Sequence, residues 1–164
     1  MGGCGQGGPL VLEGGASTSG HGAMKDQIEQ VLQDARRLRA DGRAGEAETA
    51  YLDARRLARA AKEEAALAHA LRHLSDLARE RGAAGEAWAN ASEAAQLYRG
   101  RGDRLGLANA VRLQALSAAS EEEARTCWQE ARGVYAELGV AAGVAECDAR
   151  LRGEGEAMAA GVAV

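Results

Sequence analysis

Apolar residues recur at intervals of three and four positions from residue 24 to residue 152, and this spacing predicts amphipathic α-helices. Short polar stretches that contain glycine interrupt the pattern, among them "DGRAG", "RGAAG" and "GRGD", and such stretches typically end helices. Ser120, followed three residues later by Glu123, forms a capping box that predicts a helix start. The helices are predicted over residues 24–40, 44–60, 63–81, 84–99, 104–118, 120–137 and 140–152.

The apolar face of each predicted helix is expected to point into a common core. Alanine and glycine recur on these faces, which would let neighbouring helices approach closely, and larger side chains would fill the remaining space. The larger residues expected in the core include Ile28, Tyr51, Leu71, Leu74, Trp88, Tyr98, Val111, Trp128 and Tyr135.

The pattern repeats itself after 40 residues. "GRAGEA" at 42–47 corresponds to "GAAGEA" at 82–87, and "AALAHALR" at 65–72 to "LGLANAVR" at 105–112. A weaker third copy follows at an offset of 37 residues. Each unit is a pair of helices that cannot bury its apolar face alone but can do so when stacked on its neighbours. The sequence therefore predicts an all-α solenoid of three helix pairs with a short C-terminal capping helix.

At the boundary between two units, the chain resembles tetratricopeptide repeats, and most closely the 40-residue variety found in kinesin light chains. That variety carries Gly-Asp-x-x-Gly-x-Ala-x-Ala at this place. The resemblance covers about residues 24–152 and implies a right-handed superhelix of helical hairpins with a concave groove. The chain departs from the family at Ser75 and Ala115, which replace the glycine of a Leu-Gly pair. The matching residues are Gly102, Asp103, Gly106, Ala108 and Ala110.

In this family the first helix of each pair lines the groove, and the resemblance implies that such positions bind the partner. Arginine binds carboxylates through two parallel hydrogen bonds, so an acidic segment or a C-terminal carboxylate would suit this groove. Arg72 and Arg112 align at the 40-residue offset, and their joint replacement by alanine is expected to abolish peptide capture. Alternatively, these arginines are solvated and pair with carboxylates at helical spacing. The groove positions are Glu29, Arg36, Arg39, His69, Arg72, Asp76, Arg79, Asn109, Arg112 and Leu116.

Composition and charge narrow the class of partner. The chain of 164 residues has a net charge of -4, which gives no overall basic footprint for nucleic acid. No apolar run approaches the roughly 20 residues of a membrane span. Cys4, Cys127 and Cys147 are odd in number and widely spaced, which favours a reducing cytoplasm over a disulfide framework. We therefore expect a cytoplasmic adaptor that binds a peptide or protein; the alternative is a structural homo-oligomer that assembles through its helical faces.

Candidate chemistry is sparse. His69 and His73 are four residues apart, which is the geometry of a two-histidine metal site, but no third ligand is evident. No catalytic arrangement and no phosphate-binding glycine loop can be argued from the spacing, so neither an enzyme, a cofactor nor a metal is expected. The glycine-rich residues 1–23 are expected to be a disordered tail, or a leader before a start at Met24, and residues 153–164 a flexible tail.

Overall fold

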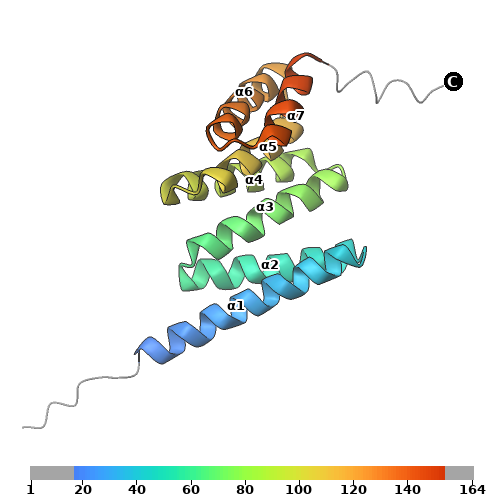
Figure 1. Ribbon diagram of the computed structural model, residues 1–164. Coiled ribbons are helices and arrows are strands. Elements are labelled where there is room, and N and C mark those ends of the chain that lie inside the picture. The colour runs from blue at the N-terminus through green and yellow to red at the C-terminus, as the bar shows by residue number, and fades with distance from the viewer. Residues whose placement is uncertain (1–16, 154–164) are drawn as a thin grey trace, which may run out of the picture.

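The computed structural model describes residues 17–153, which form seven α-helices and no strand (Figure 1). The all-α prediction is thereby confirmed, whereas residues 1–16 and 154–164 of the expected tails lie outside the described residues. The helix expected from residue 24 already begins at Ser17. Nε2 of His21 lies 2.9 Å from a carboxylate oxygen of Glu63, so this extension contacts the next helix pair. The helices are α1 (Ser17–Ala40), α2 (Ala44–Ala61), α3 (Glu64–Glu80), α4 (Ala84–Arg101), α5 (Arg104–Ser117), α6 (Glu121–Glu137) and α7 (Ala141–Leu151).

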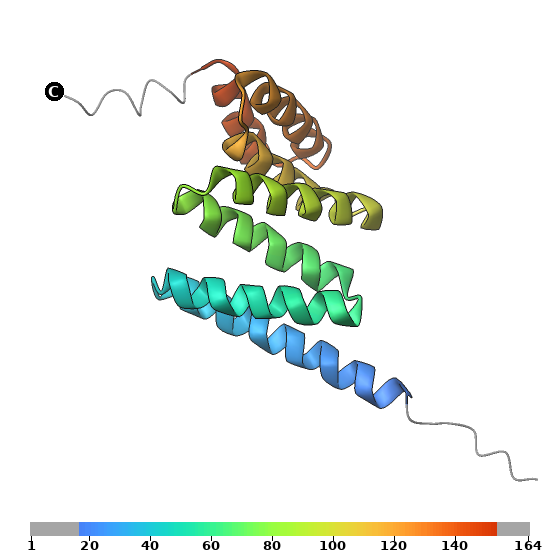
Figure 2. The ribbon, with the colours of Figure 1, turned by 180° about the vertical axis from the view of Figure 1, so that it is seen from behind.

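Helices that follow one another in the sequence pack against each other, so the molecule is a stack that runs from α1 to α7 (Figures 1 and 2). Helix α3 also lies against α1 and α5, whereas among the described residues α2, α4 and α6 make no comparable backbone approach to one another. The odd-numbered helices α1, α3 and α5 therefore form the more closely spaced layer. We call the surface of this layer the odd-helix face.

Ion pairs between long side chains connect the even-numbered helices, whose backbones lie farther apart. Arg59 of α2 lies 2.5 Å from Glu93 of α4, and Arg99 of α4 lies 2.6 Å from Glu130 of α6. The pairing of a glutamate with an arginine of the preceding even-numbered helix therefore repeats along the stack.

Alanine is the most frequent residue in the core. Ala35, Ala54, Ala94 and Ala131 are fully buried, and their small side chains let the helix backbones approach closely. Most of the larger residues expected in the core are buried, but Trp88 is only partly covered. The buried large side chains are Ile28, Tyr51, Leu71, Leu74, Tyr98, Val111, Trp128 and Tyr135.

A tyrosine ring packs directly on a helical glycine in two consecutive units. A Cβ atom added to Gly106 would lie 2.4 Å from Cδ1 of Tyr98, and one added to Gly143 would lie 2.6 Å from Cγ of Tyr135. Both the tyrosines and the glycines are 37 positions apart, which is the offset of the weaker repeat. The glycines are therefore required at these two seams because the tyrosine rings occupy the space of a side chain.

The end of α2 differs from the other helix ends because a lysine takes the left-handed conformation. Lys62 has a φ of 57°, whereas Gly42, Gly82, Gly102 and Gly139 take similar positive values at other ends. An L-residue with a side chain is strained there and glycine is not. Lys62→Gly is therefore expected to raise the free energy of unfolding by about 1 kcal/mol, measured by urea denaturation. Gly82→Lys is the reciprocal control and should lower it; a lower unfolding midpoint for Lys62→Gly would contradict this explanation.

Candidate partner-binding surface

The ten groove positions lie on α1, α3 and α5, which confirms that they occupy the odd-numbered helices but not that they bind a partner. Six of them gather where α1 packs against α3. Asn109 and Arg112 lie on α5 and contact α6 and α7. Leu116 lines a different cavity at the far end of the stack. The six gathered residues are Arg36, Arg39, His69, Arg72, Asp76 and Arg79.

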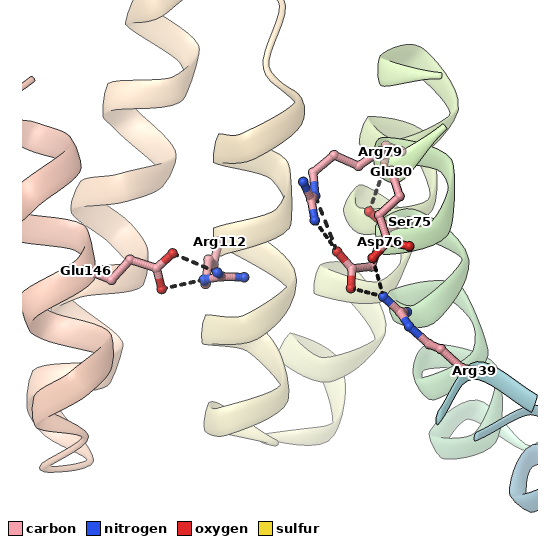
Figure 3. Close-up of polar contacts among 8 residues, drawn as sticks. Arg39, Ser75, Asp76, Arg79, Glu80, Arg112 and Glu146 are labelled. Atoms are coloured by element: carbon pink, nitrogen blue, oxygen red, sulfur yellow. Dashed lines mark hydrogen bonds and ion pairs between the residues drawn. The ribbon is translucent and has the colours of Figure 1, made fainter. Parts of the chain in front are cut away.

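Asp76 of α3 is shared by two arginines (Figure 3). Arg39 of α1 donates to its Oδ2 atom at 2.5 Å and Arg79 to its Oδ1 atom at 2.8 Å. Arg39 also donates to Glu80 at 2.6 Å. Burial opposes ionisation of Asp76, but the hydrogen bond from Arg79 and the charge of Arg39 outweigh it and lower the pKa of the carboxyl group. This network contains two guanidinium groups and two carboxylates, so its charges balance.

Next to this network, two arginines contact neutral histidines instead of carboxylates. Nε of Arg36 donates to Nε2 of His69 at 3.2 Å, and Nη2 of Arg72 lies 3.0 Å from Nε2 of His73. Since arginine can only donate, both imidazole nitrogens accept. We call Arg36, His69, Arg72 and His73 the arginine–histidine cluster. The ring of Tyr51 stacks on His73 with 4.7 Å between the ring centroids.

The histidines of this cluster are neutral at pH 7. Burial, followed by the positive charge of Arg72, lowers the pKa of His69 to about 4 and that of His73 to about 3. Within residues 17–153, neither Arg36 nor Arg72 has a carboxylate at ion-pair distance. The cluster therefore carries two positive charges that form no direct ion pair in this part of the chain, although Glu29 and Glu63 line the cavity that Arg36 and His69 also line.

Arg112 is placed differently from Arg72, although the two residues align in the sequence. Its Nε and Nη2 atoms donate to the two carboxylate oxygens of Glu146 at 2.6 and 2.7 Å (Figure 3). The position that corresponds to Arg72 in its contacts is Asn109. Arg72 acts on the hydroxyl group of Tyr98 of α4, and the hydroxyl group of Tyr135 of α6 donates to Asn109 at 2.8 Å. Helix α5 has 14 residues and α3 has 17, whereas the turns that follow them, 118–120 and 81–83, are equally long. Contacts with the following helix therefore recur at an offset of 37 residues instead of 40.

The alternative interpretation, in which the arginines pair at helical spacing, describes only part of the surface. Arg79 and Asp76 are three residues apart on one helix. Arg39 and Arg112 instead find carboxylates on other helices, 37 and 34 positions away in the sequence. The repeat pattern did not identify Glu146 as a partner because no local signal links residues so far apart.

Two cavities flank this surface. One of about 310 Å³ lies between α1 and α3 and is lined by Ile28, Leu32, Glu29, Arg36 and His69, among others. The other, of about 400 Å³, lies between α5, α6 and α7. It contains Leu116 and Trp128, and the guanidinium of Arg150 lies 5.9 Å from the centroid of the Trp128 ring. The first cavity opens beside the arginine–histidine cluster, and Glu29 belongs to its rim.

The part of the chain that the structure describes holds no group of three or more histidine, cysteine or acidic residues able to bind a metal ion. The Nε2 atoms of His69 and His73 are occupied by arginine contacts. Cys127 and Cys147 are unpaired, and burial raises the pKa of both thiols, which disfavours the reactive thiolate. None of the described helices combines the length and apolar character needed to cross a bilayer.

Over residues 17–153, the fold and this surface define an all-helical protein whose helices pack in sequence order. Its odd-helix face carries a basic cluster in which Arg36 and Arg72 form no ion pair. Neither the known protein families nor the curated protein sequences contain a match to this chain. The contacts and charges of the odd-helix face are therefore the basis for the function proposed below.

Proposed function

We propose that the protein is a helical-repeat adaptor, similar to tetratricopeptide-repeat proteins, that binds an acidic segment or a C-terminal carboxylate of a partner protein on its odd-helix face. In this proposal α1–α6 are three hairpins of a right-handed solenoid, and α7 is the capping helix. The 40-residue repeat and the packing of helices in sequence order support this architecture. The unpaired cysteines Cys127 and Cys147 are compatible with the reducing cytoplasm that we propose as its compartment.

The single observation that carries this function is the chemical nature of the partners of Arg36 and Arg72. Both guanidinium groups contact uncharged groups, so a carboxylate can bind them without displacing an internal ion pair. Arg72 is already half-buried, and a charge-assisted hydrogen bond is stronger where water is partly excluded. Arg112 differs because the carboxylate of Glu146 already occupies it.

Replacing Arg36 and Arg72 together by alanine is expected to weaken binding of an acidic peptide by about a hundredfold or more, because two charge-assisted hydrogen-bonding groups are lost. The probe is a fluorescein-labelled octaglutamate peptide with a free C-terminus, and fluorescence anisotropy at low ionic strength gives the dissociation constant. The matched control is Arg112→Ala, which should change the affinity less than threefold. The double variant Arg72→Ala and Arg112→Ala should then behave like Arg72→Ala alone.

Equal affinity of the wild type and the variant lacking Arg36 and Arg72 would exclude this face as the binding site. Multi-angle light scattering of the unliganded protein tests the rival function. A concentration-dependent oligomer in which the peptide cannot bind would favour a structural homo-oligomer, whereas a monomer that binds the peptide would favour the adaptor.

A further inference from the structure

The arginine–histidine cluster has a charge that distinguishes between classes of anion. We propose that Arg36, which contacts His69, and Arg72, which contacts the neighbouring His73, form a binding site for a dianionic phosphoryl group, either free or carried by a phosphorylated segment of the partner. This inference names the ligand chemistry of the face described above and therefore rests on the proposed function.

The charge balance of the surrounding side chains favours a dianion. Arg39 and Arg79 are neutralised within the network that Asp76 and Glu80 complete. Arg36 and Arg72 remain. Arg36 contacts His69 and Arg72 contacts His73, and the centroids of the two imidazole rings are 4.5 Å apart. A single carboxylate neutralises one of these charges, whereas a phosphoryl dianion neutralises both and offers three oxygens to the two planar donors.

Two buried polar atoms near the cluster add an independent observation. The hydroxyl group of Tyr51, on a fully buried side chain, and Nη1 of Arg39 have no hydrogen-bond partner among the described residues. Arg36, Arg39 and Arg72 all act on the Tyr51 hydroxyl, and the ring of Tyr51 stacks on His73. Buried polar groups without a partner are rare in proteins. Both atoms are shielded from solvent, so they mark unsatisfied polarity beneath the cluster and are not themselves ligands of the phosphoryl group.

The three histidines of the chain provide a direct test, because two of them lie in the cluster and His21 lies outside it. The ring ¹H–¹³C signals are followed by NMR while inorganic phosphate, sulfate, acetate or chloride is added at pH 7.5 and constant ionic strength. The signals of His69 and His73 are expected to shift to saturation with phosphate and sulfate, while those of His21 stay in place. Acetate should bind at least about tenfold more weakly than phosphate, because it neutralises only one of the two guanidinium charges.

Variants show whether the two arginines are responsible. Arg36→Gln and Arg72→Gln should each weaken phosphate binding by about tenfold or more. Arg72→Lys keeps the charge but loses the forked donor and should give an intermediate affinity in a folded protein. Arg125→Gln, which changes an exposed arginine of α6, is the matched control and should leave the affinity unchanged. Equal shifts of all three histidines, or shifts that persist in Arg36→Gln and Arg72→Gln, would overturn the proposed site.

An acidic peptide with and without one phosphoserine separates this inference from the proposed function. Arginine-dependent binding of both peptides, at least about tenfold tighter for the phosphorylated one, would support both. If the unphosphorylated peptide binds through Arg36 and Arg72 but phosphate gives no saturable shift, the phosphoryl site is refuted and the carboxylate-binding function stands. If phosphate binds and the unphosphorylated peptide does not, the phosphoryl site stands and the carboxylate-binding function is refuted.

Discussion

Replacing Gly106 by alanine is expected to lower the free energy of unfolding by about 2–3 kcal/mol. The new Cβ atom would lie 2.4–2.7 Å from three atoms of the Tyr98 ring, closer than carbon atoms approach in folded proteins. Either the ring or helix α5 has to move, and such overpacking of a core costs more than the roughly 1 kcal/mol that alanine gains over glycine in a helix. Urea denaturation followed by circular dichroism measures the change.

Gly133 provides the matched control for this substitution, because it is also helical but has no atom within 4 Å of an added Cβ. Gly133→Ala should raise the free energy of unfolding by about 0.5–1 kcal/mol through helix propensity alone. If the same substitution changes the free energy of unfolding in opposite directions at these two helical glycines, the contact with the tyrosine ring, and not the loss of glycine, causes the effect. A stabilising effect of Gly106→Ala would contradict the packing described for this seam.

The cost of Gly106→Ala is also expected to depend on Tyr98. Forty positions earlier, the first unit carries Ala58 and Ala66 where the second carries Tyr98 and Gly106. Tyr98→Ala should therefore remove most of the penalty of Gly106→Ala, although it leaves a cavity with a cost of its own. In a double-mutant cycle the coupling energy should be at least about 1 kcal/mol; strictly additive effects would exclude a direct contact as the cause.

Acidification from pH 7 to pH 4.5 is expected to lower the melting temperature strongly. His69 and His73 titrate at about 4 and about 3 in the folded protein, whereas unfolded histidine titrates near 6.5. Between these values the unfolded chain binds up to about two more protons than the folded chain, so stability that is complete above about pH 6.5 is lost as the pH falls. The physical cause is the cost of charging a buried imidazole beside Arg72.

The double variant His69→Gln and His73→Gln should flatten this dependence between pH 6.5 and 4.5. Differential scanning calorimetry at intervals of half a pH unit provides the melting temperatures. Asp76 contributes to stability in a separate, lower window, because its pKa lies below the ordinary value of 3.8 and its stabilisation is lost only as the pH falls further. A wild-type melting temperature that stays constant down to pH 5 would contradict the burial of neutral histidines in this cluster.

Features that depend on neighbours in the sequence were predictable. The helix starts and ends followed from glycine turns and from Ser120, whose side chain accepts a hydrogen bond from the backbone of Glu123 at 3.2 Å. The buried faces followed from helical periodicity. The predicted start of α1 was wrong. Gly20 and Gly22 locally favour a tail, whereas the contact of His21 with Glu63 is a tertiary interaction that the local sequence does not indicate. Partners of charged side chains were not predictable when they lie on different helices.

The sequence alone determined that the chain is a stack of helices with a repeat of about 40 residues, because helix propensity, glycine stops and apolar periodicity act over a few residues. It also placed the ten groove positions on alternate helices. Only the tertiary structure decided which of the charged side chains at these positions form ion pairs and which do not. Arg39 and Arg112 are neutralised by carboxylates 34 to 41 positions away, whereas Arg36 and Arg72 contact uncharged histidines. The relative positions of neighbouring helices determine these partners, and the difference of three residues in length between α3 and α5 is enough to give two aligned arginines different surroundings.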